Sequence, residues 1–399
     1  MSNLVIRLKP QEERRLRAGH LWIYSNEIDS ARTPLKTITP GSLCRFEDAR
    51  GKPLGAGYIN PHALLCGRVL TGQYDAVIDA DWFARRFTAA AALRERLYAE
   101  PFYRFVFGEA DGLPGLVVDR YGDVLVVQIG TAGMELLKVK LLAALQMVFK
   151  PRGIVLRNDS PSREAEALPL YVEEVGEVPE TVVIIEGGVK FEIAMRGGQK
   201  TGWFFDQRDN RDRLSRYIMP TSKVLDVFSY VGAWALRARA FGAAEISCID
   251  SSAPALEAAA RNAALNDPSH GKGLEALRGE ALDVMKQLAN DGRRFDLVVV
   301  DPPALIKRKR DHEEGLGLYG RLNRAALNLL TPGGILVSCS CSHHLTPEEL
   351  QRELLRESRA AGKRLQILEQ LEQGPDHPVH PAIPETRYLK GFICAAVHE

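Results

Sequence analysis

The chain has 399 residues, with 52 Lys and Arg against 51 Asp and Glu, so its formal net charge is only +1. Hydrophobic residues make up 45% and charged residues 26%, which is ordinary globular composition and argues against disorder or a fibre. There is no apolar run of about 18 residues and no signal-peptide core at the start, so we expect no membrane span and a cytoplasmic location. Six cysteines are too few for a disulfide scaffold in a chain of this length.

Residues 1–80 predict a small β-rich domain, because short apolar strands alternate with Gly and Pro breaks, and we expect a compact barrel. Basic side chains cluster near its start, against only Glu12 and Glu13: Arg7, Lys9, Arg14, Arg15 and Arg17. Such a cluster can bind phosphate although the whole chain is nearly neutral. Arg14, Arg15 and Arg17 are therefore candidate nucleic-acid contacts, and the alternative is a solvated charged face.

Residues 81–190 predict a connector helix, over about 81–100, followed by an α+β middle domain. Its strands are expected at about 103–107, 116–119, 124–129, 153–157 and 182–186, and its further helix at about 134–149. The Gly-rich stretch 108–115 lies between two of these strands, and we interpret it as a structural hairpin turn.

Residues 191–399 alternate between strands and helices, which is typical of a doubly wound, mostly parallel α/β sheet. Strands are expected at about 224–228, 245–250, 295–300 and 335–340, and helices at about 232–241, 253–266, 281–290, 316–330 and 347–361. In such sheets, ligands bind beyond the carboxyl ends of the strands.

Acidic residues follow successive strands of this predicted sheet. Asp226 lies in the first strand, Asp250 ends the second, and Glu280, with Ala281, precedes a helix. These acids can accept hydrogen bonds from ribose hydroxyls and an adenine amino group, although each alone is more often a helix cap or a solvent-facing charge. The turn 228–232 contains only Gly232 of a dinucleotide fingerprint, which disfavours NAD. An acidic lining repels pyrophosphate but suits a cationic sulfonium, so the sequence predicts S-adenosylmethionine as the cofactor.

Two further residues at strand ends are candidates for the chemistry. Asp301 follows a buried apolar strand and precedes two prolines, so it is a rigid acid that can clamp a heterocyclic base beside the cofactor. Cys341 lies at the end of the next strand, where a thiolate can act as a nucleophile if local cations or a helix terminus favour it. Carbon 5 of cytosine needs such a thiolate at carbon 6 before it can accept a methyl group, whereas nitrogen methylation does not.

Other readings of these residues are open. Cys339 is interpreted as a buried core cysteine, and the same reading is the alternative for Cys341. A metal site from the cysteines and His343 and His344 matches no ordinary zinc spacing, so we expect no metal. The basic run 307–310 can grip RNA phosphates through Lys307, Arg308, Lys309 and Arg310, or it can be a solvated charge run.

With these residues in place, the chain resembles a known family: the bacterial large-subunit ribosomal RNA cytosine-5 methyltransferases, which have an N-terminal PUA domain and a class I Rossmann-like catalytic domain. The resemblance covers nearly the whole chain, and the order and spacing of the motifs are more specific than any one of them. The matching segments are Arg17–Asn26, Gly108–Leu116, Lys200–Arg208, Phe228–Gly232, Asp301–Pro303, Ser340–Ser342 and Tyr388–Phe392.

The resemblance implies that S-adenosylmethionine is bound by Gln207, Phe228, Ser229, Tyr230, Asp250 and Glu280. It also implies that Cys341 is the nucleophile, that Asp301 holds the cytosine, that the PUA domain binds ribosomal RNA, and that the protein is a homodimer. Glu280 stands where the family more often has Asp, and Pro303 stands where many RNA cytosine-5 methyltransferases carry a second, product-releasing cysteine. The base that removes the carbon 5 proton is thus left unassigned.

Competing functions make different use of the same residues. An RNA guanine or adenine N-methyltransferase would use Asp301–Pro303 and ignore Cys341. A non-enzymatic RNA-binding or assembly factor would not bind the cofactor. A small-molecule methyltransferase is disfavoured by the large N-terminal region that precedes the catalytic domain.

Overall fold

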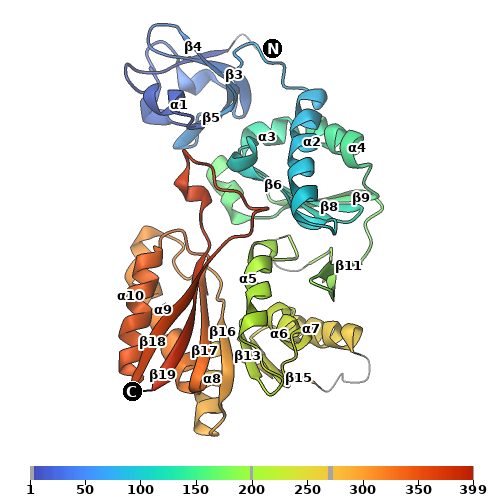
Figure 1. Cartoon of the computed structure of the whole chain (residues 1–399). Coiled ribbons are helices and arrows are strands. Elements are labelled where there is room, and N and C mark those ends of the chain that lie inside the picture. The colour runs from blue at the N-terminus through green and yellow to red at the C-terminus, as the bar shows by residue number, and fades with distance from the viewer. Residues whose placement is uncertain (1–3, 198–200, 268–272, 399) are drawn as a thin grey trace. The chain divides into compact units, whose positions relative to one another are not determined.

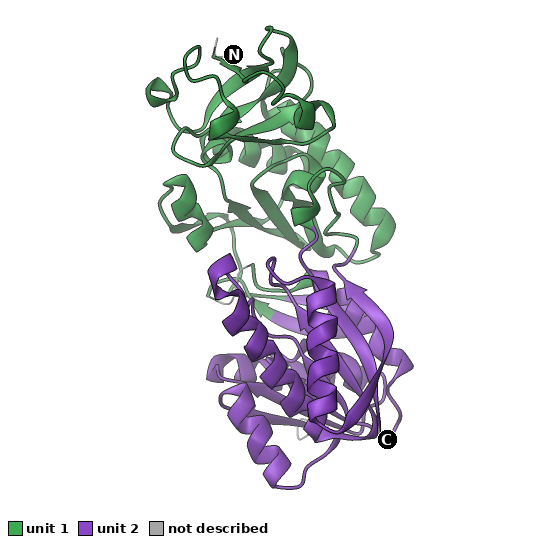
Figure 2. Cartoon of the chain, turned by 90° about the vertical axis from the view of Figure 1, so that its left-hand side faces the viewer, with its two compact units in different colours: residues 1–182, 193–205, 375–386 green, residues 183–192, 206–374, 387–399 purple. Residues whose placement is uncertain are grey.

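The computed structural model describes residues 4–197, 201–267 and 273–398, so Lys200 of the motif that ends at Arg208 lies outside the described residues. The chain forms two compact units (Figure 2). Unit 1 comprises residues 1–182, 193–205 and 375–386, and unit 2 comprises residues 183–192, 206–374 and 387–399. The C-terminal part of the chain therefore contributes a short segment to unit 1.

The first part of unit 1 is a five-stranded sheet with the strand order β1-β3-β4-β5-β2 (Figure 1). Its elements are β1 (Val5–Arg7), α1 (Arg14–Arg17), β2 (Trp22–Tyr24), β3 (Ser42–Glu47), β4 (Pro53–Ile59) and β5 (Leu65–Thr71). Strand β1 pairs with β3 in parallel, and the other neighbours are antiparallel. Ile6, Ile23 and Phe46 are completely buried between them, which gives this small sheet its own apolar core.

The second part of unit 1 is a five-stranded sheet with the order β10-β9-β8-β7-β6. Its strands are β6 (Phe102–Phe107), β7 (Leu116–Tyr121), β8 (Val124–Ile129), β9 (Gly153–Asn158) and β10 (Tyr171–Gly176). Its helices are α2 (Ala80–Leu97), α3 (Ala132–Leu136) and α4 (Lys138–Phe149). The hairpin interpretation of residues 108–115 is confirmed, because β6 and β7 pair antiparallel across them.

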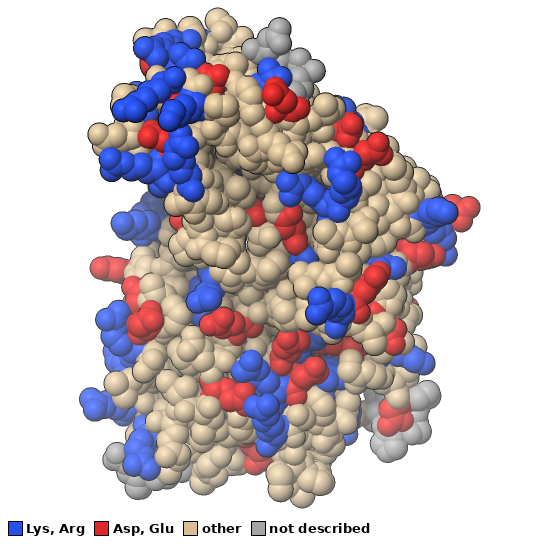
Figure 3. Space-filling view, turned by 45° about the horizontal axis from the view of Figure 1, so that its top comes forward, with Lys and Arg blue, Asp and Glu red and all other residues tan. Residues whose placement is uncertain are grey.

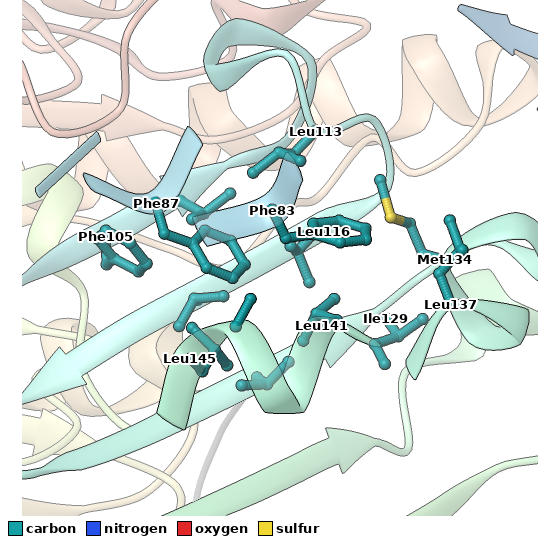
Figure 4. Close-up of a cluster of buried hydrophobic side chains, with 14 of the residues drawn as sticks. Phe83, Phe87, Phe105, Leu113, Leu116, Ile129, Met134, Leu137, Leu141 and Leu145 are labelled. Carbon is teal, nitrogen blue, oxygen red and sulfur yellow. The ribbon is translucent and has the colours of Figure 1, made fainter. Parts of the chain in front are cut away.

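Helix α2 is more than the connector that the sequence predicted. Phe83 and Phe87 are completely buried and share a core with Phe105 of β6 and Leu141 and Leu145 of α4 (Figure 4). The aromatic side chains that indicated the helix are the ones that cover one face of the middle sheet. The predicted helix at 134–149 was also too simple, since it is two helices that meet at residue 137.

Tyr58 joins the two parts of unit 1. Its ring is completely buried, and its hydroxyl lies 2.8 Å from the Pro114 carbonyl oxygen, to which it donates, and 2.9 Å from Thr131 Oγ1. Trp22 Nε1 donates to Glu109 Oε1 at 2.9 Å from the same side. The Gly-rich turn between β6 and β7 therefore helps to hold the N-terminal sheet.

The strand predicted near 182–186 is present as β11 (Thr181–Glu186), but it does not join the middle sheet. It pairs in a separate two-stranded sheet with β12 (Val189–Ala194), which the sequence reading missed. Strand β10 was missed as well, because four of its six residues are exposed and its glutamates interrupt the apolar alternation.

Unit 2 is built on a seven-stranded sheet with the order β15-β14-β13-β16-β17-β19-β18 (Figure 1). Its strands are β13 (Lys223–Val227), β14 (Glu245–Asp250), β15 (Leu274–Arg278), β16 (Phe295–Val300), β17 (Leu330–Ser340), β18 (Lys363–Glu372) and β19 (Lys390–His398). Its helices are α5 (Arg208–Arg213), α6 (Ala233–Ala240), α7 (Ala253–Asn266), α8 (Ala281–Asn290), α9 (His312–Leu329) and α10 (Pro347–Ala360).

The parallel strands β13 to β17 confirm the predicted doubly wound α/β fold. Strand β19 was not predicted, and it runs antiparallel between β17 and β18. Apolar side chains of β16 are buried on both faces, as expected for a strand covered by helices on each side. Within the described ranges, none of the helices has the length and apolar content that crossing a membrane requires.

Candidate active site

The turn after β13 has an unusual backbone. Phe228, Tyr230 and Gly232 have φ values of 66°, 49° and 80°, and the first two are not glycines, so surrounding contacts must hold them in this conformation. Asp250, at the end of β14, supplies one such contact, because its Oδ2 accepts a hydrogen bond from Tyr230 N at 2.9 Å. Its Oδ1 accepts from Ser252 N at 2.9 Å. Asp250 thus fixes the turn that separates β13 from α6.

The three acids predicted to line a cofactor site have different surroundings. Asp226 is completely buried inside β13, with Oδ2 accepting from Ala235 N at 3.1 Å and no hydrogen-bond partner for Oδ1. Burial raises the pKa of Asp226 to about 7. Asp250 is half-buried, and Glu280 is exposed at the N-terminal end of α8. The three acids were expected to line the cofactor site together, and the structure instead encloses Asp226, which precedes the last residue of a central strand.

Asp301 is oriented by two side chains. Gln207 Nε2 lies 3.1 Å from each carboxylate oxygen, and Trp234 Nε1 donates to Oδ2 at 3.0 Å. Asn210 Nδ2 in turn donates to Gln207 Oε1 at 2.7 Å, which fixes the amide with its nitrogen toward Asp301. Burial raises the pKa of Asp301 to about 6, against the stabilising hydrogen bonds from Trp234 and Gln207. Trp234 and Asn210 were missed by sequence analysis, since a lone aromatic and a lone amide carry no spacing signal.

Cys341 and Cys339 differ as the sequence predicted. Cys339 is completely buried in β17, whereas Cys341 lies one residue beyond the strand and is half-buried. Strands β16 and β17 are neighbours, with Val300 paired to Ser338, so Asp301 and the cysteine follow adjacent strands at the same edge of the sheet. These two predicted residues are therefore brought to one place.

The serines on either side of Cys341 belong to a buried hydrogen-bond network. Ser340 Oγ donates to the Tyr319 hydroxyl at 2.8 Å, and that hydroxyl lies 3.0 Å from Ser342 Oγ. Ser342 Oγ also accepts from Ile306 N at 3.1 Å. The network ties the end of β17 to α9 and to the loop after Pro303, and so it fixes the backbone at Cys341.

Lys390, on the neighbouring strand β19, also contacts the backbone beside Cys341. It is cross-strand from Ser340 in the β17–β19 pair, is 5% exposed, and its Nζ donates to the Ser342 carbonyl oxygen at 2.5 Å. Burial lowers the pKa of Lys390 to about 8, while the Cys341 thiol and Glu349 act in the opposite direction. Sequence analysis placed Lys390 in a matching motif but gave it no role.

Comparisons with known proteins agree with this geometry. Residues 157–390 match the family described as S-adenosylmethionine-dependent methyltransferase, and residues 6–72 match the PUA-like domain. A protein of Cronobacter sakazakii named ribosomal RNA large subunit methyltransferase I is 35% identical, over 99% of each chain. One of the same name from Shewanella denitrificans is 37% identical, over 97% of this chain and 98% of the relative. The chain belongs to the S-adenosylmethionine-dependent methyltransferases.

Solved structures share the fold of this methyltransferase. A putative SAM-dependent methyltransferase from Streptococcus mutans aligns with a TM-score of 0.81 at 18% identity, covering 98% of this chain and all of the other. A putative methyltransferase complexed with SAH aligns with a TM-score of 0.82 at 17% identity and the same coverage. The class I methyltransferase fold with an N-terminal PUA-like domain, predicted from the sequence, is thereby confirmed.

S-adenosylmethionine is the cofactor of this methyltransferase, as predicted. The residues present fit a cationic ligand, because the carboxyl groups of Asp250, Glu280 and Asp301 stand at the carboxyl ends of β14, β15 and β16. Gly232 immediately precedes α6, and a Cβ there would lie 3.1 Å from the side chain of Ala259, so the turn packs closely against α7. A larger residue at this position would push the turn outward.

The basic cluster near the N-terminus is more neutral than predicted. Carboxylates from distant parts of the sheet pair with its arginines: Arg7 with Glu47 at 2.6 Å, Arg15 with Glu27 at 2.5 Å and Arg17 with Asp48 at 2.8 Å. Basic side chains still gather on the N-terminal sheet, at the upper left of Figure 3. Arg14 is exposed there, and the run 307–310 is exposed in the loop between β16 and α9.

Proposed function

We propose that the enzyme transfers a methyl group from S-adenosylmethionine to carbon 5 of a cytosine in 23S ribosomal RNA, through a covalent adduct with Cys341. The names of the relatives support a substrate in large-subunit ribosomal RNA. The half-buried thiol beyond β17, beside the strand that ends at Asp301, is the observation that carries the choice of carbon 5. A nitrogen methyltransferase has no use for a nucleophile at that place.

The chemistry follows from the needs of cytosine. The Cys341 sulfur adds to carbon 6, and the electron pair of the 5,6 double bond makes carbon 5 nucleophilic. The bound cofactor supplies an electrophilic methyl group. Loss of the proton from carbon 5 then restores the double bond, the sulfur–carbon bond breaks, and Cys341 leaves as a thiolate.

Asp301 holds the pyrimidine in this proposal. Its pKa of about 6 leaves it mostly ionised at neutral pH, and an ionised carboxylate accepts a hydrogen bond from the exocyclic amino group that distinguishes cytosine from uracil. Trp234 and Gln207 keep its oxygens in a fixed direction. Because the Asp301 carboxylate is already oriented, it can position the base without first rearranging, and this contributes to the rate of methyl transfer.

The cofactor site lies at the ends of β13, β14 and β15. The residues proposed to form the cofactor site are Gln207, Asp226, Phe228, Ser229, Tyr230, Gly232, Asp250, Glu280, Ala281 and Asp301. Within this set, the completely buried Asp226 acts by supporting the turn, since it accepts a hydrogen bond from the first turn of α6. Asp250 and Glu280 supply acceptors for the ribose and the adenine.

The remaining parts of the chain are proposed to bind and position the RNA in a cytoplasmic homodimer. Domains over 1–80, 81–190 and 191–399 serve as an RNA-binding PUA-like domain, a middle domain and the methyltransferase domain. Arg14, Arg15 and Arg17 contribute at the first, where Arg14 is exposed, and Lys307, Arg308, Lys309 and Arg310 contribute beside the active site. Phosphate contacts of this kind position the RNA without selecting its sequence.

Methylation of 23S ribosomal RNA from a strain that lacks the gene tests the proposal. Wild-type enzyme and the Cys339→Ala variant are expected to add one 5-methylcytosine that bisulfite sequencing detects, and Cys341→Ser is expected to add none. A methyl group on a guanine or adenine nitrogen, with full activity of Cys341→Ser, would replace the proposal by the N-methyltransferase. Failure of the wild-type chain to bind S-adenosylmethionine in a calorimeter would favour an RNA-binding factor.

A further inference from the structure

We propose that Lys390 is a positioning residue that keeps the Cys341 sulfur in its thiolate form. The inference rests on the proposed function of Cys341, because it explains how an otherwise ordinary thiol becomes a nucleophile. An ordinary cysteine is only a few per cent thiolate at about pH 7, so a cytosine-5 mechanism needs a local source of positive charge.

The geometry fixes the ammonium group near the cysteine. Lys390 begins β19 and lies cross-strand from Ser340, and its Nζ donates to the carbonyl oxygen of Ser342 at 2.5 Å. The residues that hold it thus immediately precede and follow Cys341. Lys390 is 5% exposed, so solvent screens its charge less than it would at the surface.

The electrostatics of the surroundings agree with this role. Burial lowers the pKa of Lys390 to about 8, and the Cys341 thiol is the strongest opposing influence, which places the two groups within electrostatic reach. Lys390 remains mostly charged at neutral pH. The thiol proton passes to water, and the resulting thiolate is stabilised by the nearby ammonium group.

Other titratable groups face the same region. Glu349 in the first turn of α10 raises the pKa of Lys390 and so favours the charged ammonium group, and its Oε1 is paired with His312 Nε2 at 3.1 Å. The Tyr319 hydroxyl is committed to Ser340 and Ser342 and stays neutral, since burial raises its pKa. Of Lys390, Glu349 and Tyr319, Lys390 is the one whose positive charge favours the thiolate.

A matched control is present in the same sheet. Lys363 begins β18, is 7% exposed, and its Nζ donates to the carbonyl oxygens of Leu327 and Leu330, the second at 3.2 Å. It is a buried lysine held by carbonyl oxygens, as Lys390 is, but it lies cross-strand from His398, at the opposite end of β19 from Lys390. Replacing Lys363 tests the effect of losing any buried lysine.

The test measures the rate at which iodoacetamide alkylates the full-length enzyme from about pH 5.5 to about pH 9.5, with Cys341→Ser as the blank. The other described cysteines are buried, so the difference reports Cys341. We expect Lys390→Met to raise the apparent pKa of the Cys341 thiol by about one unit. Alkylation then slows about 10-fold at neutral pH, and the plateau rate at high pH is unchanged. Lys390→Arg should retain the wild-type profile, and Lys363→Met should do so as well.

A second variant acts on Lys390 without replacing it. Glu349→Gln keeps the side chain that caps α10 but removes a charge that raises the pKa of Lys390, so less of Lys390 is charged and alkylation at neutral pH should become slower. This variant keeps the proposal testable if Lys390→Met does not fold. Identical profiles for wild type, Lys390→Met and Glu349→Gln would overturn the inference, as would an equal shift in Lys363→Met. Because alkylation needs no RNA, a failure here is distinct from a failure of the proposed methylation, which would appear as an active Cys341→Ser enzyme.

Discussion

Trp234 Nε1 donates a hydrogen bond to Asp301 Oδ2 at 3.0 Å, and so the helix that leaves the turn after β13 orients the acid that ends β16. Gln207 approaches both oxygens of the same carboxylate. The cofactor turn and the acid proposed to hold the base are thereby coupled through one indole ring.

Replacement of Trp234 by Phe removes this donor and keeps most of the ring volume. The loss of one hydrogen bond to a charged group is worth about 1.5–3 kcal/mol, so we expect kcat to fall about 10-fold or more. Binding of S-adenosylmethionine, measured by calorimetry, should change much less. Trp82→Phe, on the buried face of α2, is the control for loss of a buried indole. An unchanged kcat in Trp234→Phe would show that Gln207 alone orients Asp301.

Two buried serines of β17 and the turn after it should respond differently to alanine. Ser342 Oγ accepts from Ile306 N, so Ser342→Ala leaves a buried backbone donor unpaired and should cost about 1–3 kcal/mol in the free energy of unfolding. Ser338 is equally buried but its Oγ has no hydrogen-bond partner, so Ser338→Ala should be neutral or slightly stabilising. Urea unfolding of both variants provides the comparison. Equal losses would argue against a network that fixes the backbone at Cys341.

The buried carboxyl of Asp226 should make stability fall as the pH rises. Its pKa is raised to about 7 in the folded chain, against 3.8 as the ordinary value, so between these values the folded state keeps a proton that the unfolded state has lost. The free energy of unfolding therefore decreases across this interval. Asp226→Asn removes the titration and keeps an acceptor for Ala235 N, so it should be more stable than wild type above about pH 7, on the order of a few kcal/mol at most.

Urea unfolding of the cofactor-free enzyme at several pH values measures this effect. Asp283→Asn, in which an exposed acid of α8 is replaced, is the control for loss of a carboxylate. Parallel pH profiles for Asp226→Asn and wild type would contradict the prediction, because they would mean that Asp226 titrates alike in both states.

The sequence was sufficient for the parallel part of the sheet and for the contrast between Cys339 and Cys341. Strands such as β16 are continuous apolar runs, and a residue just past such a run has less cover than one inside it. Asp226 and Asp250 were found in the same way, because each lies in or at the end of an apolar strand, β13 or β14. Their different burial was not predictable, because it depends on how α6 packs over Asp226.

The local sequence pattern could not reveal residues whose contacts depend on strands or side chains far away in the sequence. Lys390 reaches the Cys341 backbone only because β19 inserts between β17 and β18, and β18 is a mostly exposed strand whose polar residues hide its apolar alternation. The partners of the N-terminal arginines lie up to 40 residues away, at Glu47 in the case of Arg7. Counting only the charged residues of the local sequence therefore overestimated how positive that surface is.

RNA that carries 5-fluorocytidine at the modified position tests the central claim most directly. Fluorine cannot leave carbon 5 as a proton does, so an enzyme that adds a thiolate to carbon 6 remains attached to the RNA after methyl transfer. On a denaturing gel, we expect an RNA–protein adduct with wild type and Cys339→Ala in the presence of S-adenosylmethionine, and none with Cys341→Ser. Methyl transfer without any adduct, or an adduct that persists in Cys341→Ser, would contradict the role of Cys341.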